Sequence, residues 1–175
     1  MNRREQIVGL LKDWGIAAAV TVLVVGVWRM TQPDPIHPGL DAPILTTPYV
    51  DGRPYDLAAE DADVVVVNFW ATWCGPCRME IPDFSAFATA NPDVKMLGVS
   101  IDDSMQPPQL ARAAKALGIT YDVLHDADGR ARSTWGVDNF PTTFVLDSHH
   151  DVVDSHIGVA SRQWLEQAVA KARAR

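Results

Sequence analysis

Cysteine is scarce in this sequence of 175 residues, which contains only Cys74 and Cys77. So few thiols exclude a small, disulfide-dense scaffold, because such domains rely on several cross-links in place of a hydrophobic core. A structural zinc site built on four cysteines is excluded as well. Three interpretations of the pair stay open on the count alone: a redox pair, half of a mixed metal site, or a structural staple.

Basic charge is also sparse, and the formal net charge is −7. Residues 1–30 contain four Lys or Arg and two Asp or Glu, a net charge of +2, which leaves −9 for the remainder. An acidic body without a basic stripe argues against nucleic acid as a partner. Hydrophobic residues make up 47% and charged residues 21%, values typical of a globular protein and not of a disordered one.

Charge is absent from one long stretch near the start, WGIAAAVTVLVVGVW, from Trp14 to Trp28. Fifteen helical residues rise about 22 Å, and two more bring the segment closer to the roughly 30 Å hydrocarbon layer. We therefore expect residues 1–30 to be an N-terminal membrane anchor with a transmembrane helix at about 14–30. The alternatives are a buried core helix and a cleaved signal peptide, but the run lacks a polar face and no small-x-small cleavage site follows it.

Three basic residues precede this run, which predicts a cytoplasmic N-terminus. We expect a single pass through the cytoplasmic (inner) membrane, with the C-terminal domain extracytoplasmic, or periplasmic. Residues 31–43 then contain four prolines and form an extended linker. The folded domain is expected over 44–175.

The domain reads as an α/β fold with a mixed central sheet, because strand-like and helix-like segments alternate. Asp51-Gly52 predicts the turn of a β-hairpin over 44–57. The continuous apolar run 64–70 predicts a strand buried on both faces. Further strands are expected at 95–101, 123–125, 142–147 and 152–158, and helices at 76–90, 107–118, 131–135 and 162–174.

The cysteine pair lies where the strand 64–70 gives way to a helix. The free N–H groups at that helix start favour a thiolate at Cys74, and Cys77 lies one turn further in, so Cys74 is expected to attack and Cys77 to resolve. A disulfide this short constrains little of the unfolded chain, which weakens the staple interpretation. A redox function without metal or cofactor is favoured.

The stretch NFWATWCGPCRMEIP resembles the active-site segment of thioredoxin-fold proteins, and WCGPC at 73–77 matches the thioredoxin motif. Phe140-Pro141 resembles the cis-proline loop of the same proteins. With the expected anchor and hairpin, and an extra helix-plus-strand unit over 106–125, the sequence is similar to the TlpA- and ResA-like family of membrane-anchored disulfide reductases. The resemblance implies a thioredoxin-like fold with an N-terminal β-hairpin and a helix-plus-strand insertion, preceded by one transmembrane helix.

The resemblance also implies the composition of the site. Client segments would be bound by residues that flank the two catalytic cysteines, namely Trp73, Gly75, Pro76, Phe140 and Pro141. Thioredoxins have a buried aspartate six residues before the first cysteine, where this chain has Asn68, which cannot titrate. Glu80 corresponds to a glutamate that tunes the thiols in ResA-like proteins, and it is expected to take the proton of Cys77. The alternative is a solvated glutamate on an amphipathic helix.

The direction of electron flow is predicted from the dipeptide Gly75-Pro76, which matches thioredoxin, at about −270 mV, and not the strong oxidants near −120 mV. The family implies an extracytoplasmic protein-disulfide reductase supplied by a membrane thiol transporter of the CcdA or DsbD type. Its expected clients are apocytochrome c, copper-chaperone thiols or oxidised secreted proteins. Two alternatives stay open: a copper-binding protein that uses the same cysteines, and a disulfide-forming oxidase.

Overall fold

The computed structural model describes residues 14, 15, 17–27 and 38–175. In the first part, residues 14–15 and 17–27 are helical. Among the residues described, no helix is long and apolar enough to cross a membrane. Positions 16 and 28–30 of the expected span lie outside the described residues, so the anchor stays a prediction.

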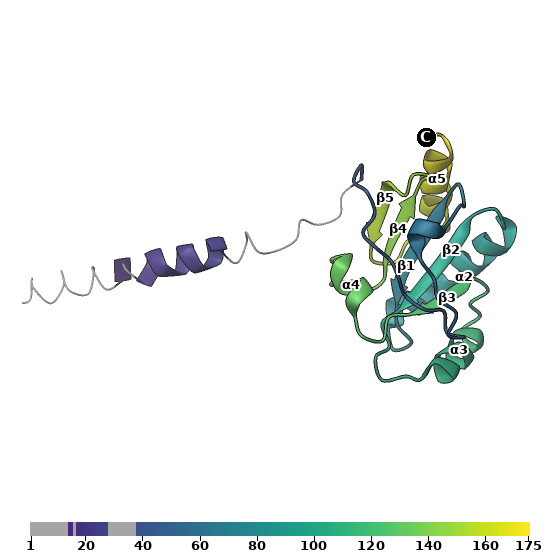
Figure 1. The fold of residues 1–175 in the computed structure, drawn as a ribbon, viewed down its shortest axis with the longest axis horizontal. Coiled ribbons are helices and arrows are strands. Elements are labelled where there is room, and N and C mark those ends of the chain that lie inside the picture. The colour runs from purple at the N-terminus through teal and green to yellow at the C-terminus, as the bar shows by residue number, and fades with distance from the viewer. Residues whose placement is uncertain (1–13, 16, 28–37) are drawn as a thin grey trace, which may run out of the picture. The chain divides into compact units, whose positions relative to one another are not determined.

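The second part is built on a mixed sheet of five strands, in the order β3-β2-β1-β4-β5 (Figure 1). β1 pairs in parallel with β2, and β2 with β3, whereas β4 runs antiparallel to both β1 and β5. The strands are β1 (Val65–Trp70), β2 (Lys95–Ser100), β3 (Asp122–His125), β4 (Thr142–Leu146) and β5 (Val152–Ile157). The helices are η1 (Leu57–Ala59), α2 (Gly75–Ala90), α3 (Pro107–Ala116), α4 (Arg130–Thr134) and α5 (Arg162–Arg173).

Two hydrophobic layers enclose this sheet. On one face, α2 and α5 cover β1, β4 and β5 with side chains such as Phe84, Phe87 and Leu165. On the other face, Trp135 and the segment that contains Leu45 pack on β1, β2 and β4. β1 is buried along its whole length, because both faces of the central strand are covered. The predicted central strand is confirmed, as are the other four strands and the four helices of the domain, each within two residues at either end.

The predicted β-hairpin over 44–57 is wrong as a pair of strands. The turn exists, with Gly52 at φ 85°, but the two arms share only one isolated bridge, Thr46 with Asp56. Pro48 and Pro54 lack the N–H that a ladder needs. The first arm instead pairs with β3, where Tyr49 forms a bridge with Leu124.

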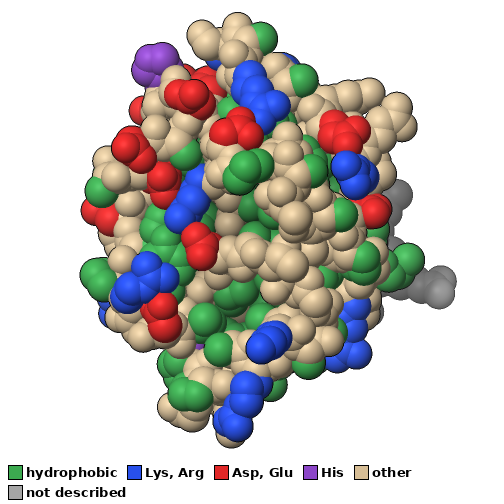
Figure 2. Space-filling view, turned by 90° about the vertical axis from the view of Figure 1, so that its right-hand side faces the viewer, with side chains coloured by type: hydrophobic (Ala, Val, Ile, Leu, Met, Phe, Trp, Pro, Cys, Tyr) green, Lys and Arg blue, Asp and Glu red, His purple; other side chains and the backbone are tan. Residues whose placement is uncertain are grey.

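Charges of both signs share the surface. On the face drawn in Figure 2, Lys and Arg side chains are interspersed with Asp and Glu and with apolar patches. The exclusion of nucleic acid as a partner stays a prediction from the charge balance. α3 and β3 occupy the expected insertion over 106–125, with β3 at the edge of the sheet.

Candidate functional site

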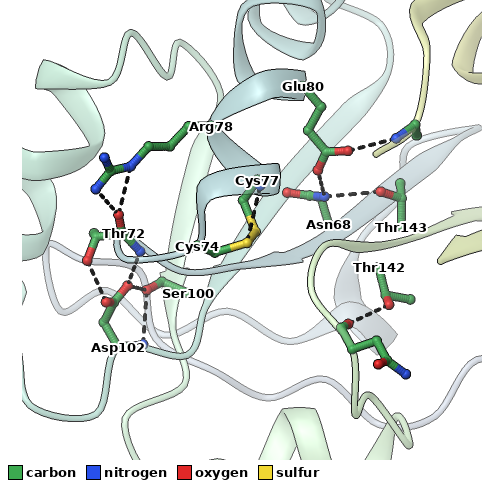
Figure 3. Close-up of a disulfide and its surroundings, with 12 residues drawn as sticks. Asn68, Thr72, Cys74, Cys77, Arg78, Glu80, Ser100, Asp102, Thr142 and Thr143 are labelled. Atoms are coloured by element: carbon green, nitrogen blue, oxygen red, sulfur yellow. Dashed lines mark hydrogen bonds between the residues drawn. A yellow bond between two sulfur atoms is a disulfide. The ribbon is translucent and has the colours of Figure 1, made fainter. Parts of the chain in front are cut away.

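A disulfide joins Cys74 to Cys77 at the point where β1 ends and α2 begins (Figure 3). Cys74 is the N-cap of α2, and its sulfur accepts a hydrogen bond from the backbone N–H of Cys77 at 3.2 Å. Cys74 is 5% exposed and Cys77 is fully buried. The helix N–H groups and the positive end of the helix dipole stabilise negative charge on the outer sulfur, so this arrangement favours Cys74 as the attacking thiolate.

The loop before Cys74 is anchored through Thr72. The backbone N–H and the hydroxyl of Thr72 both donate to the carboxylate of Asp102, at 2.9 and 2.6 Å. The guanidinium of Arg78 donates from Nε to the carbonyl oxygen of Thr72 at 2.9 Å. Ser100 donates a further hydrogen bond to Asp102 at 2.7 Å. The first turn of α2 and the end of β2 therefore hold this loop from two sides.

The hydrogen bonds between Thr72 and Asp102 were not predicted from the sequence. Asp102 follows β2, and Thr72 follows β1, so both lie beyond the carboxyl ends of neighbouring parallel strands. Such ends meet at one edge of a sheet, which is where sites of α/β proteins lie. An aspartate directly after a predicted buried strand was the available signal.

Glu80 lies inside the protein at 1% exposure, so the solvated alternative is wrong. Its Oε1 accepts a hydrogen bond from Nδ2 of Asn68 at 2.7 Å, and its Oε2 accepts one from the backbone N–H of Ala160 at 3.0 Å. The Asn68 Nδ2 also donates to the hydroxyl of Thr143 at 3.0 Å. The carboxylate thus links α2 to β1 and to the loop before α5 (Figure 3).

Burial raises the pKa of Glu80 from its ordinary value of 4.5 to about 7, and the hydrogen bonds from Ala160 and Asn68 oppose this rise. Such a carboxyl exchanges protons near neutral pH, which is the property required of a general base for a buried thiol. Because Glu80 follows Cys77 by three residues on the same helix, both side chains lie on one side of α2.

Of the predicted client-binding residues, Trp73, Gly75 and Pro76 adjoin Cys74 or Cys77 along the chain, and Phe140 packs against the apolar cluster that contains Cys74. The peptide bond between Phe140 and Pro141 is cis, as the resemblance implied. Trp73 is 64% exposed and meets Phe140 edge to face, with 6.1 Å between ring centroids. Gly75 and Pro76 form the exposed first turn of α2 between the two cysteines. An exposed aromatic next to a reactive sulfur offers apolar contact area to a docked chain.

No group of three or more His, Cys, Asp or Glu side chains that could hold a metal ion occurs in the described part of the chain. The two cysteines therefore have no third ligand of these types beside them within residues 38–175.

Comparison with known proteins places residues 38–155 in the AhpC/TSA family. The chain is 28% identical to the thioredoxin-like protein YneN of Bacillus subtilis over 167 residues, which cover 90% of this chain and 97% of that one. It is 26% identical to the thiol-disulfide oxidoreductase ResA of Bacillus anthracis, over 76% of this chain and 77% of that one.

Two solved structures of thiol:disulfide interchange proteins have a similar fold. A thiol:disulfide interchange protein of the thioredoxin family from Chlorobium tepidum aligns with a TM-score of 0.66 and 29% identity, covering 78% of this chain and 97% of that chain. A second structure from Chlorobium tepidum, described as a DsbE-type interchange protein, aligns with a TM-score of 0.71 and 25% identity, covering 79% and 99%.

Proposed function

Because this chain belongs to the AhpC/TSA family and has a thioredoxin-like fold, we propose that it is a thiol-disulfide oxidoreductase that reduces disulfides in client proteins. The observation that carries the proposal is the position of the disulfide. Its outer sulfur, on Cys74, lies at the start of α2, and its inner sulfur, on Cys77, lies one turn from a buried carboxyl of raised pKa.

In the proposed reaction, the reduced protein attacks a client disulfide with the thiolate of Cys74. The client S–S bond breaks, a mixed disulfide forms, and the second client sulfur leaves as a thiolate that takes up a proton. Cys77 then gives its proton to Glu80 and attacks the sulfur of Cys74. This step releases the other client sulfur as a thiolate, which takes up the proton now held by Glu80. The client is then reduced by two electrons, and the Cys74–Cys77 disulfide is formed.

The reductive direction rests on Gly75-Pro76, the dipeptide of thioredoxin. A reductase outside the cytoplasm needs a supply of two electrons per turnover, because its compartment is oxidising. We assign that supply to a membrane thiol transporter of the CcdA or DsbD type. The clients in this proposal are apocytochrome c, copper-chaperone thiols or oxidised secreted proteins.

The proposed location is the outer side of the cytoplasmic membrane, with residues 1–30 as anchor, 31–43 as linker and 44–175 as the catalytic domain. It rests on the uncharged run from Trp14 to Trp28 and on the basic residues before it. Fractionation of cells, followed by protease treatment of spheroplasts, tests the location directly.

Insulin reduction by the dithiol form tests the proposed activity. We expect the purified protein to reduce insulin with dithiothreitol as donor, and the Cys74→Ser variant to be inactive. Titration of the pair in glutathione or dithiothreitol buffers tests the direction. A potential near −270 mV supports a reductase, and one near −120 mV supports the oxidase alternative. Copper bound in proportion to the protein, without insulin reduction, would favour the copper-handling alternative.

A further inference from the structure

The side-chain amide oxygen of Asn68 is buried but accepts no hydrogen bond from any residue that the structure describes. The residue is 1% exposed, and both hydrogens of its Nδ2 are donated, one to Glu80 and one to Thr143. A buried carbonyl oxygen without a partner destabilises the folded state, and native proteins rarely retain one, so this atom at a reactive site points to a function.

The orientation of this amide follows from the charge on Glu80. A carboxylate accepts hydrogen bonds and repels a carbonyl oxygen, so Nδ2 faces Glu80 and Oδ1 faces away from it. In Figure 3 the oxygen end of Asn68 points toward Cys77. Cys77 is fully buried and lies one helical turn before Glu80 on the side of α2 that covers β1.

From this geometry, and on the basis of the proposed function, we infer that Asn68 is a positioning residue whose side-chain amide bonds the sulfur of Cys77 once the disulfide is reduced, and so couples the protonation of Cys77 to that of Glu80. The amide can bond Cys77 in both protonation states, through Oδ1 when Cys77 is a thiol and through Nδ2 when it is a thiolate. When Cys77 is a thiol and Glu80 a carboxylate, Oδ1 accepts from the S–H and Nδ2 donates to Glu80.

When the proton has moved from Cys77 to Glu80, the amide is satisfied after it turns over. Oδ1 then accepts from the protonated Glu80, and Nδ2 donates to the thiolate. Thr143 stays bonded in both arrangements, because its hydroxyl can accept or donate. Asn68 itself neither gains nor loses a proton. A hydrogen bond to a thiolate is charge-assisted and stronger than one to a thiol, so the net effect of Asn68 is to lower the pKa of Cys77.

Few other titratable groups of the described chain face this cluster. Cys74 caps α2, and Cys77 lies in its first turn. Tyr121 approaches from the segment before β3, and its pKa is raised mainly by burial, with the charge of Glu80 as the smaller cause. His156 lies on β5, bonded to the carbonyl of Val159 beside the loop that binds Glu80. The pKa of Glu80 is raised by burial and not by a neighbouring charged side chain.

The test measures the pKa of Cys77 in the full chain carrying Cys74→Ser, where Cys77 is the only thiol and the ultraviolet absorbance of the thiolate reports its ionisation. We expect Asn68→Leu to raise this pKa by about one to two units, as for loss of a hydrogen bond to a charged group. The rise should persist when Glu80→Gln is also present, because the contact with the sulfur is direct.

Ser85→Ala is the matched control, since Ser85 is buried on α2 and its hydroxyl likewise has no partner in the described part of the chain. It should leave the pKa of Cys77 unchanged. An equal shift in Ser85→Ala, or no shift from Asn68→Leu in the Glu80→Gln background, overturns the inference. Both results are independent of insulin reduction by the wild type, whose failure would instead overturn the proposed function.

A measurement on the wild type covers the case in which Asn68→Leu does not fold. The carbon resonance of the Asn68 side-chain carbonyl should move when the disulfide is reduced, because Oδ1 gains a donor. The same resonance position in the oxidised and reduced protein would exclude the bond to Cys77.

Discussion

Glu80 accepts a hydrogen bond from the backbone N–H of Ala160, a residue 80 positions later in the chain. This bond joins α2 to the loop between β5 and α5. It is one of two hydrogen bonds that stabilise the ionised form of Glu80, the other coming from Asn68. The ionisation of Glu80 therefore affects both the chemistry of the thiols and the stability of the fold.

The stability of the oxidised protein should fall as Glu80 ionises. Its pKa is raised by folding from 4.5 to about 7, so the stabilising contribution is fully present below pH 4.5 and is lost as the pH rises through 7. The shift corresponds to on the order of 3 kcal/mol. Urea unfolding across this pH range should show that loss in the wild type and a flatter profile in Glu80→Gln. Parallel profiles would contradict the raised pKa.

Exchange kinetics should depend on the same carboxyl. At a pH above 7, Glu80 is ionised and can accept the proton of Cys77, so the release of a client from the mixed disulfide should quicken with an inflection near pH 7. In Glu80→Gln that inflection should vanish and the rate fall by about 10²-fold or more, the usual contribution of a positioned base. Stopped-flow tryptophan fluorescence checks this, and an unaltered profile would remove Glu80 from the mechanism.

The two cysteines should differ in trapping experiments. Cys77→Ser retains the outer sulfur of Cys74 but lacks the resolving thiol, so it should accumulate mixed disulfides with client proteins. Cys74→Ser should accumulate none, because its remaining sulfur is fully buried. Non-reducing gels and mass spectrometry of the trapped species measure the difference, and equal trapping by both variants would reverse or remove the assigned roles.

Asp102→Asn should loosen the loop before Cys74. The carboxylate accepts hydrogen bonds from the backbone and hydroxyl of Thr72 and from Ser100, and an amide can accept on one atom only. We expect a loss of about 1–3 kcal/mol in the free energy of unfolding, measured by denaturant titration. As a control, Asp128→Asn alters an exposed carboxylate paired with Arg130 and should change stability by less than about 0.5 kcal/mol.

Trp73→Ala should weaken client binding without affecting the fold. The side chain is 64% exposed and packs edge to face against Phe140 beside the reactive sulfur. We expect a several-fold higher KM for a protein client, an unchanged KM for a small disulfide, and an unchanged melting temperature. An equal change for both substrates would show that Trp73 acts on the thiols and not on the client.

Local patterns were sufficient to predict most of the fold. The uninterrupted apolar run of β1 and the N-cap of α5, where Ser161 accepts from the N–H of Trp164, are encoded by adjacent residues. The arms of residues 44–57 were misread because their backbone partners include β3, which lies some 70 residues away in the chain. The expected bounds of the strands were nearly right because burial on both faces leaves few positions for polar residues.

The site was predictable only in part, because some of its contacts join residues that are far apart in the sequence. The motif around Cys74 and Cys77 is local, and its placement at the start of α2 follows from the strand before it and the proline after it. The bonds from Ala160 to Glu80 and from Thr72 to Asp102 join segments that only the completed sheet brings together. Short-range periodicity carries no information about such pairs.

The start of the domain is bound to β5. The N–H of Gly39 donates to the carbonyl of Val152, and Asp41 forms an isolated β-bridge with Asp151. Residues 39–41 are therefore bound where β5 starts. The cis-proline loop lies where β4 starts, and because β4 and β5 are antiparallel neighbours, the two strands start at opposite ends of the pair. Residues 39–41 are therefore held at the end of the β4–β5 pair that lies away from the cis-proline loop.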